Sequence, residues 1–515
     1  MRALPSLTAD HVVVIGAGIA GLAAAVRLRA AGLRVTLLER HSHLGGKIRT
    51  VPSAAGPINA GPTVMTLRSV FDELFAAAGA RLEDHVELIA HDILARHAWA
   101  DRSMLDLHAN MADSIAAVDA FAGARAADQF RQFCARTQQL FQAFEAPIMQ
   151  AAVPRPMDLT RHVLRQPRLI PAMAPLSSLQ SMLKRSFDDQ RLQQLFGRYA
   201  TYVGGAPQWS PAILSLIWQA EAQGVWSPRG GMHALAEAVG QLAQRLGVEV
   251  KTDAHVARLS VQSGRVAGVE LAEGPRVTCD AVVYAGDPRA LAAGSLGHAF
   301  RAVAPQTMRL PRSHSARVHS FAAAADGLPL AHHTVLFGDV PNAEFRALRT
   351  GTMPTDATVY ICALDRAEGA PTPGTLERFE IISNAPATEA ALQPEELDQW
   401  HHRTMQRMAQ SFDLRFTPTP SPQTVTTPQA FAAMFPDSLG ALYGQSPHGL
   451  MSAFQRPTAR TPIPGLYLAG GGTHPGAGVP MAARSGQHAA EAILNDRTST
   501  LRSGQTAMRG GMSTA

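Results

Sequence analysis

The segment HVVVIGAGIAG, residues 11–21, decides the fold class of this chain. Four apolar residues run directly into G-x-G-x-x-G, in which the glycines are Gly16, Gly18 and Gly21. Between a strand and a helix, the first glycine permits a tight turn, the second admits a pyrophosphate close to the backbone, and the third lets the helix approach the sheet. Because unpaired N–H groups and a partial positive charge lie at a helix N-terminus, we expect the phosphates of a dinucleotide to bind there.

The residues that follow complete a βαβ pattern. A helical segment, residues 22–31, ends at Gly32, and the next predicted strand runs into Glu39. An acid in this position accepts hydrogen bonds from an adenosine ribose. The alternatives are an apolar strand–turn–helix with incidental glycines and, for the uncharged residues 12–26, a secretory signal. The acidic residue Asp10 and the three interrupting glycines argue against a signal peptide.

The loop after the second strand favours FAD over NAD as the ligand. Residues 39–47 read ERHSHLGGK, and an NAD-binding domain needs neither the glycine pair nor the lysine. In one large group of flavoproteins, glycines matching Gly45 and Gly46 let this loop fold back over the FAD pyrophosphate, and a basic residue matching Lys47 adds charge. Residues 59–65, NAGPTVM, also resemble that group, in which this backbone passes the isoalloxazine ring.

The sequence has no second complete G-x-G-x-x-G fingerprint after a strand. We therefore expect no NAD(P)H-binding domain that would reduce the flavin. This favours a flavin that takes electrons from a substrate and passes them to a separate acceptor, for which oxygen or a membrane quinone is the expectation.

A second glycine-rich strand–loop–helix pattern lies near the C-terminal end. Residues 464–480 read PGLYLAGGGTHPGAGVP, and Pro480 suits the first turn of the following helix. A helix N-terminus aimed at the flavin pyrimidine would stabilise the negative charge of the reduced ring. The alternative is a glycine-rich turn before a terminal helix. Because the fingerprint lies more than 400 residues upstream, we expect both ends of the chain to build one site.

With these motifs, residues 11–494 resemble the bacterial carotenoid desaturases of the FAD-dependent amine oxidase and phytoene desaturase superfamily. The likeness is strongest in GGGTHPGAGVP, residues 470–480. Further matches are WSPRGGM, residues 226–232, and HHTV, residues 332–335. One departure is Asn59, where the related flavoproteins often have Asp; an amide can still form hydrogen bonds there but carries no charge.

Two neighbouring matches narrow the resemblance. GALYG, residues 440–444, followed by FQRP, residues 454–457, is most similar to the hydroxycarotenoid 3,4-desaturases of purple bacteria. This implies an FAD-dependent enzyme that introduces a C=C bond at C3–C4 of 1-hydroxylated acyclic carotenoids. The alternatives are a phytoene desaturase or a carotenoid isomerase of the same fold, and a non-catalytic carotenoid-binding protein. An amine oxidase would need an aromatic cage beside the flavin, and no aromatic residue flanks residues 470–478.

The resemblance implies an α/β fold, with a Rossmann-type, glutathione-reductase-like FAD domain and an inserted mixed α+β domain that binds substrate and faces a membrane. In the insert, residues 358–362 predict a strand and residues 394–412 a helix. The predicted FAD domain comprises residues 8–70, 210–290 and 455–495, the inserted domain residues 71–209, mainly helical, and 291–454, and the predicted disordered tail residues 496–515.

The FAD contacts follow from the motifs and the resemblance together. Within residues 248–285 the sequence predicts short strands at 248–251, 256–261, 266–271 and 277–285, and in the family a valine matching Val256 contacts adenine through its backbone. The alternative is that Val256 only fills the sheet. The predicted FAD-binding residues are Gly16, Gly18, Ile19, Ala20, Gly21, Glu39, Arg40, Gly45, Gly46, Lys47, Gly61, Pro62, Thr63, Val64, Val256, Gly471, Gly472, Thr473, Val479, Pro480 and Met481.

The amino-acid composition restricts the cellular compartment and the classes of binding partner that we expect. The 515 residues are 46% hydrophobic with a net charge of +5, and no basic stripe with interleaved aromatic residues suggests nucleic acid as a partner. The three cysteines, Cys134, Cys279 and Cys362, show no CxxC and no metal-ligand spacing, so we expect free thiols in a reducing cytoplasm and no metal site. No apolar stretch is long and uninterrupted enough to span a bilayer as a helix.

A carotenoid substrate resides in a membrane, so its enzyme needs an apolar entrance. Residues 146–187 combine aliphatic residues with basic ones such as Arg161, Arg165 and Arg168, and Asp158 is the clear acidic exception. Such a segment fits peripheral contact with anionic lipid on the inner or intracytoplasmic membrane. The alternative is a pair of amphipathic core helices with solvated basic faces.

The expected reaction removes a hydride from a carbon beside the polyene onto the flavin, and a neighbouring carbon then loses a proton. Because the polyene delocalises the positive charge, the proton is acidic and no strong base is required. No catalytic acid or base is therefore assigned from the sequence. His332 and His333 could simply cap a strand, and His474, which lies in the glycine loop, is expected to be structural.

Overall fold

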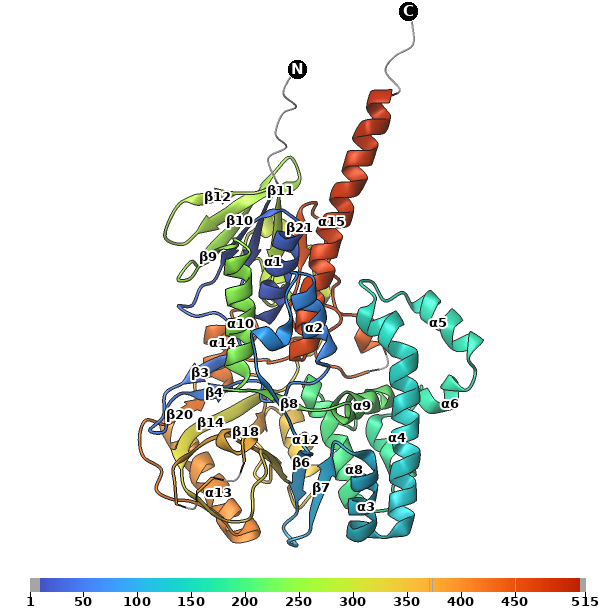
Figure 1. Ribbon diagram of the computed structural model, residues 1–515, viewed down its shortest axis with the longest axis vertical. Coiled ribbons are helices and arrows are strands. Elements are labelled where there is room, and N and C mark those ends of the chain that lie inside the picture. Colours follow the sequence, from blue (N-terminus) through green and yellow to red (C-terminus); the bar gives the residue numbers. More distant parts are fainter. Residues whose placement is uncertain (1–9, 370, 373, 450, 510–515) are drawn as a thin grey trace, which may run out of the picture.

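The computed structural model describes residues 10–369, 371–372, 374–449 and 451–509. The N-terminal fingerprint lies in a five-stranded sheet whose pairs are all parallel (Figure 1). Successive side chains point to opposite faces of this sheet: Val12 and Val14 face a helical layer, while Val13 faces the other side. In spatial order the strands are β21 (Leu466–Leu468), β13 (Ala281–Tyr284), β1 (His11–Ile15), β2 (Arg34–Leu38) and β9 (Glu249–Lys251).

Helices cover one face of this sheet and antiparallel strands cover the other. On the helical face, the first and last helices of the chain lie against each other, which joins its two ends. These three layers confirm the expected Rossmann-type, glutathione-reductase-like arrangement. The helices are α1 (Ile19–Ala30), α2 (Ser69–Ala76), α10 (Met232–Arg245) and α15 (Val479–Arg509), and the opposite layer holds β10 (Val256–Gln262), β11 (Arg265–Leu271), β12 (Arg276–Thr278) and α11 (Pro288–Ala293).

A seven-stranded mixed sheet forms the other half of the molecule, and only its β16–β6 pair is parallel. Val335 faces a helical bundle, whereas Leu336 faces α13 (Pro394–Phe412), whose start is fixed by a capping box between Gln393 and Glu396. The strands in order are β20 (Thr424–Thr426), β14 (Ser315–Ala323), β18 (Glu377–Ala385), β17 (Val359–Ala363), β16 (His333–Leu336), β6 (Ile93–Ala98) and β7 (Met104–His108).

The bundle beside this sheet has an aromatic core that contains Phe130, Phe133, Phe196 and Trp218. Its helices are α3 (Met111–Ala122), α4 (Ala124–Phe144), α5 (Pro156–Arg165), α6 (Leu169–Met173), α7 (Leu179–Ser186), α8 (Gln190–Gly197) and α9 (Leu216–Ala222). The remaining strands form the pairs β3 (Arg49–Val51) with β4 (Ile58–Ala60), β5 (Leu88–Ala90) with β8 (Trp226–Pro228), and β15 (Ala325–Gly327) with β19 (Leu414–Phe416), and the remaining α-helices are α12 (Ala343–Arg349) and α14 (Pro428–Met434).

The packing differs from the predicted domain boundaries at two places. Phe71 and Phe75 of α2 lie in the core of the nucleotide-binding half, although they follow the predicted boundary at residue 70. Trp218 of α9 packs against Phe130 in the helical bundle, although residues 210–290 were expected in the FAD domain. Hydrophobic pattern alone does not tell which of two neighbouring cores an apolar helix joins.

The segment predicted as strands also differs in part. Residues 249–251 form β9 of the parallel sheet, and the predicted strand over 277–285 is divided between β12 and β13. The predicted strand and helix at residues 358–362 and 394–412 are confirmed as β17 and α13.

The chain is helical where a disordered tail was expected, since α15 continues to Arg509. Contacts with the rest of the protein hold this part of α15 in place. Asp496 accepts hydrogen bonds from Arg460 at 2.9 Å and from Tyr467 at 2.8 Å, and Arg497 forms an ion pair with Asp10. Residues 510–515 of the predicted tail lie outside the described residues. Within the part of the chain that the structure describes, no helix is long and apolar enough to cross a membrane.

Candidate active site

The glycine fingerprint forms a close-packed turn between β1 and α1. The backbone N–H of Gly16, at φ +98°, donates to the carbonyl of Leu38 at 2.8 Å. A Cβ atom on Gly21 would lie 1.9 Å from the carbonyl oxygen of Gly16, so this position excludes any side chain. Gly18 differs, because an added Cβ would meet no protein atom within 4 Å. The open space at Gly18 belongs to a large cavity that the turn lines.

Glu39 is buried at the end of β2 and lines the same cavity. Its Oε2 accepts a hydrogen bond from the N–H of Ala17 at 2.7 Å, and its Oε1 accepts one from the N–H of His41 at 2.9 Å. Each carboxylate oxygen retains a lone pair for a further donor. The residue is therefore held in place by the fingerprint loop and can still accept bonds from a ribose.

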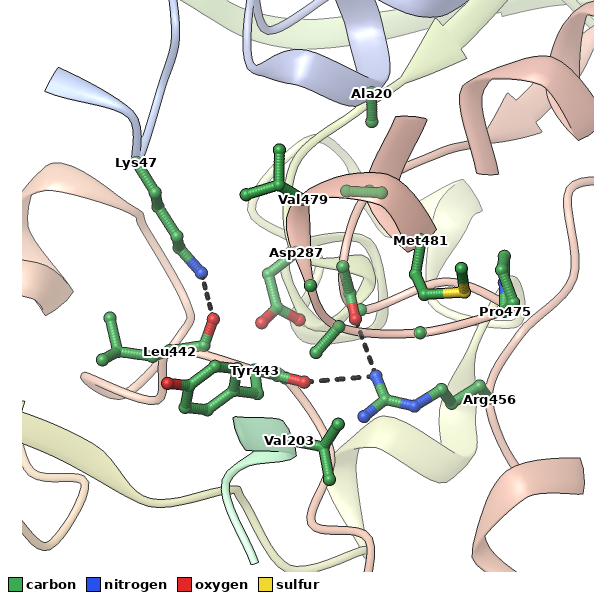
Figure 2. A pocket seen from close by; sticks show the side chains of 18 of the residues that line it. Ala20, Lys47, Val203, Asp287, Leu442, Tyr443, Arg456, Pro475, Val479 and Met481 are labelled. Carbon is green, nitrogen blue, oxygen red and sulfur yellow. Dashed lines mark hydrogen bonds between the residues drawn. The ribbon is translucent and has the colours of Figure 1, made fainter. Parts of the chain in front are cut away.

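The loop with the glycine pair folds back over the fingerprint. The N–H of Gly45 donates to the carbonyl of Ala17 at 2.9 Å, and a Cβ on Gly46 would lie 3.0 Å from the Cα of Gly18. Lys47 extends from this loop and donates to the carbonyl of Leu442 at 2.5 Å, as Figure 2 shows. Burial lowers the pKa of Lys47 to about 8. A buried ammonium with one neutral partner is well suited to a phosphate.

The loop before α15 forms the opposite wall, and the buried Arg456 holds it in place (Figure 2). The guanidinium donates to the carbonyls of Tyr443 at 3.1 Å, Gly471 at 2.7 Å and Gln445 at 3.0 Å. Burial lowers the pKa of Arg456 to about 10. Sequence reasoning noted this arginine only as part of a family match. An arginine beside two glycine-rich segments is the signal that could have identified it.

One cavity of about 1200 Å³ joins these loops. The structure brings together nineteen of the twenty-one predicted FAD-binding residues on its wall, from both ends of the chain. Gly21 and Thr473 lie behind the wall, because Gly21 packs on Gly16 and the Thr473 hydroxyl donates to Ala469 at 3.3 Å. The wall residues are Gly16, Gly18, Ile19, Ala20, Glu39, Arg40, Gly45, Gly46, Lys47, Gly61, Pro62, Thr63, Val64, Val256, Gly471, Gly472, Val479, Pro480 and Met481.

These walls fit a flavin dinucleotide. The N-terminus of α1 offers backbone N–H groups beside open space at Gly18, and Glu39 lies at the end of the adjacent strand. The first turn of α15, which begins at Val479, points a second helix N-terminus into the cavity. Val256 pairs with Leu271 at the start of β10 and also lines the cavity.

Beyond these loops the cavity becomes apolar as it enters the helical bundle and the large sheet. Phe144 of α4 and Leu159 of α5 line it, although they are far from the fingerprint in sequence. Its further apolar lining residues are Phe141, Ile148, Met149, Met173, Ile213, Leu214, Leu216, Ile217, Ala316, Val318, Ile382, Phe431, Met434, Phe435, Met451 and Phe454.

A few buried polar groups interrupt the apolar wall, and sequence reasoning missed them. Arg198 donates to the hydroxyl of Tyr202 at 2.8 Å, and that hydroxyl donates to Glu221 at 2.9 Å. The Nε of Arg198 is buried without a hydrogen-bond partner. Tyr360 also reaches the cavity from β17. A single arginine in the apolar stretch FGRYATYV, residues 196–203, is the signal that could have identified this group.

The three histidines weighed in the sequence lie behind the cavity wall. His474 is buried, and its Nε2 lies 2.8 Å from the carbonyl oxygen of Ala151, which agrees with a structural role. His332 and His333 are buried at the start of β16. Asp287 lines the cavity, but its carboxylate is paired with Arg312.

Comparison with known proteins places this geometry in a family. The family model described as "Flavin containing amine oxidoreductase" matches residues 19–494. A hydroxyneurosporene desaturase of Cereibacter sphaeroides is 51% identical over 95% of this chain and 99% of its own length, and one of Rhodobacter capsulatus is 48% identical over 95% of this chain and 98% of its own. The solved structure of cyclohexylamine oxidase from Brevibacterium oxydans shares the fold, with a TM-score of 0.59 and 17% identity over 95% of this chain and 100% of that one.

The match runs from the start of α1 to the end of the cavity-lining segments and includes the glycine pair at residues 45–46 and the glycine-rich loop before α15, so FAD is the cofactor of this chain and redox chemistry its class of reaction. The chain belongs to the flavin-containing amine oxidoreductase family.

Proposed function

We propose that this protein is an FAD-dependent desaturase that introduces a C=C bond at C3–C4 of 1-hydroxylated acyclic carotenoids. The observation that carries the proposal is one continuous cavity of about 1200 Å³, which has dinucleotide-binding loops at one end and an apolar lining at the other. The hydroxyneurosporene desaturases at 51% and 48% identity support this class of substrate.

The predicted FAD residues on the cavity wall would hold the cofactor. Gly18 leaves room for the pyrophosphate, Gly46 lets its loop approach Gly18 closely, Glu39 would bind the ribose, and Lys47 would supply a positive charge. When bound, FAD supplies the capacity to accept a hydride. The first turn of α15 would face the ring and favour the charge that the hydride brings.

The protein's part in the reaction is to position a polyene and to exclude water. The apolar wall around Phe144 and Leu159 fits a hydrocarbon chain. Leaving the substrate hydroxyl without a partner there would cost about 1–3 kcal/mol. Arg198 lines the apolar part of the cavity with guanidinium N–H donors, which favours a hydroxylated substrate over a pure hydrocarbon.

The same proposal includes peripheral contact with the cytoplasmic side of the inner membrane. Helix α5 lines the cavity with Leu159 while Met157 and Leu164 of the same helix are 77% and 69% exposed. Leu176, after α6, is 96% exposed. These helices project from the side of the molecule (Figure 1), so their apolar side chains can enter a lipid surface beside the cavity. A membrane position fits oxygen or a quinone as the electron acceptor.

The test is product analysis. Purified protein, FAD and 1-hydroxyneurosporene are incubated in liposomes with oxygen or a quinone. The carotenoids are then separated and their molecular masses are measured. A product two mass units lighter with a red-shifted spectrum supports the proposal. An unchanged mass with altered retention would instead identify an isomerase, and conversion of phytoene in preference to 1-hydroxyneurosporene would identify a phytoene desaturase. Protein without FAD is the control.

A further inference from the structure

A second cavity of about 290 Å³ lies next to the large one, and Thr63 lines both. The second cavity is lined by polar groups that include Ser227, His332, Asp365 and Glu368. Its carboxylates reach solvent, since the side chain of Asp365 is 30% exposed and that of Glu368 is 50% exposed. A polar, solvent-connected space therefore adjoins the apolar cavity at one residue.

Hydrogen bonds lead inward from Thr63. Its hydroxyl lies 2.7 Å from the hydroxyl of Tyr360, and that hydroxyl lies 2.6 Å from Nδ1 of His333. Tyr360 lines the large cavity, whereas His333 lies fully behind it. Nε2 of His333 is buried without a hydrogen-bond partner. The chain of three groups thus starts at the cavity wall and ends on an unpaired ring nitrogen.

That nitrogen belongs to a cluster of buried histidines. One ring nitrogen from each of His91, His332 and His333 lies within 4.8 Å of those of the other two. Nε2 of His91 lies 2.7 Å from the hydroxyl of Ser227, which lies 3.0 Å from Nε2 of His332. Nδ1 of His332 lies 2.9 Å from the carbonyl of Ala363. Ser227 and His332 face the second cavity, so the cluster connects to it.

The partners fix the direction in which these groups donate. A carbonyl only accepts, so Nδ1 of His332 carries a hydrogen and its Nε2 accepts from Ser227. Ser227 then accepts from Nε2 of His91. Burial lowers the pKa of His91 to about 4 and that of His332 to about 3, and it lowers the pKa of His333 well below its usual value. All three rings are therefore neutral at pH 7, and each neutral ring has one nitrogen that can accept a proton.

Each carboxylate among the described residues that line the large cavity already has hydrogen-bond or ion-pair partners. Asp287 is paired with Arg312, and Asp437 is paired with Arg289. Glu39 accepts two backbone hydrogen bonds at the nucleotide end. A proton released beside the polyene needs another way out of an apolar space.

We propose that Thr63, Tyr360 and His333 conduct the substrate proton from the flavin cavity to the histidine cluster and the second cavity. The inference rests on the proposed function. Desaturation breaks two C–H bonds: one hydrogen leaves with its electron pair to the flavin, and the other leaves as a proton while its electron pair forms the new C=C bond. Tyr360 accepts that proton, directly or through Thr63, and passes its own to Nδ1 of His333. The proton on Nε2 of His333 then moves into the cluster and to water beside Glu368.

The test follows flavin bleaching and proton release together. FAD-loaded protein is mixed anaerobically with liposomes that contain 1-hydroxyneurosporene, and a pH-indicator dye records the proton. The variants are Tyr360→Phe and His333→Gln. The matched controls are Tyr467→Phe and His319→Gln, which change buried residues outside both cavities. FAD content and melting temperature are measured for each variant to detect a loss of folding. A loss of folding alone would not make proton release lag behind flavin bleaching.

In the unmodified protein we expect bleaching and proton release to keep pace. In both cavity variants one or both rates fall by about tenfold or more, at unchanged FAD content, while the controls stay within about twofold. Rates within twofold of the original in both cavity variants would overturn the inference alone. A lack of bleaching in the original protein would overturn the proposed function and the inference with it. A stoichiometric metal ion that is lost in His91→Gln would show that the cluster binds metal instead.

Discussion

The carboxylate of Glu380 accepts a hydrogen bond from the backbone N–H of Gly61 at 2.8 Å. The contact joins β18 of the large sheet to the loop that lines the flavin cavity. Glu380 is fully buried, and its second oxygen has no hydrogen-bond partner. Burial raises the pKa of Glu380 to about 8, against the opposing effects of the Gly61 N–H and Arg49. The two halves of the molecule therefore meet at a carboxyl group that is protonated at neutral pH.

This contact predicts a pH-dependent stability. A carboxyl group whose folded pKa exceeds its unfolded pKa stabilises the fold at low pH and loses that contribution as pH rises toward the folded value. The Glu380 contribution to the unfolding free energy should thus decline between about pH 5 and pH 8, by up to about 1.4 kcal/mol per pH unit, which is measured as the difference from Glu380→Gln because the buried histidines titrate alike in both proteins. Urea unfolding at several pH values measures this decline, which Glu380→Gln should flatten. The exposed Glu389→Gln should keep it, and an equal slope in Glu380→Gln would contradict the assignment.

Two glycines of the fingerprint should respond differently to alanine. Gly21→Ala should destabilise the protein by more than about 2 kcal/mol, because the added Cβ would collide with the Gly16 carbonyl. Gly18→Ala should leave the melting temperature of the FAD-free protein within about 2 °C, since its φ is −66° and the space is open, but should weaken FAD binding at least tenfold. Thermal unfolding and FAD titration separate the two effects. Unaltered FAD affinity in Gly18→Ala would contradict the placement of the pyrophosphate.

Lys47 should make FAD binding depend on pH. Its pKa of about 8 in the FAD-free protein means that the positive charge disappears as pH rises from 7 to 9. We expect the affinity for FAD to fall over that range, and Lys47→Met to bind more weakly at pH 7 with a smaller pH dependence. Fluorescence titration at pH 7, 8 and 9 measures both. Lys184→Met, at an exposed position, is the control, and a pH dependence that survives in Lys47→Met would exclude this lysine as its source.

The helices α5 and α6 should mediate membrane contact. Leu164→Asp with Leu176→Asp should remove most binding to anionic vesicles in a flotation assay, because both side chains are exposed and apolar. Val340→Asp changes another exposed apolar residue, 51% exposed and elsewhere on the surface, and should bind normally. Changing Arg161, Arg165 and Arg168 together to Glu should reduce binding in a salt-dependent way. Flotation that none of these substitutions alters would contradict the proposed surface.

The sequence predicted the nucleotide-binding half well because its signals are local. Gly16 and Gly21 are required by a strand–turn–helix geometry that disfavours side chains at both positions, Glu39 directly follows the next strand, and family resemblance extended the prediction to the loop at Gly471. The capped helix α13 was predicted to the residue, because Pro394 marks its start.

The rest of the fold and of the candidate site depends on contacts between segments that lie far apart in the sequence. Gly486 would place a Cβ 2.1 Å from the Ala20 carbonyl, yet in sequence it is an ordinary helical glycine. The meeting of Thr63, Tyr360 and His333 depends on how β17 and β16 pair across the large sheet. Apolar periodicity likewise could not tell that residues 146–187 are divided between core, cavity wall and exposed surface.

The most direct test of the central claim is an anaerobic single turnover. FAD-loaded protein is mixed with one equivalent of 1-hydroxyneurosporene in liposomes, and the flavin spectrum and the carotenoid mass are recorded together. Transfer of two electrons from the carotenoid should bleach the flavin and yield one equivalent of a product two mass units lighter. A flavin that stays oxidised while the carotenoid is recovered unchanged would contradict the claim that one cavity holds both the flavin and the carotenoid.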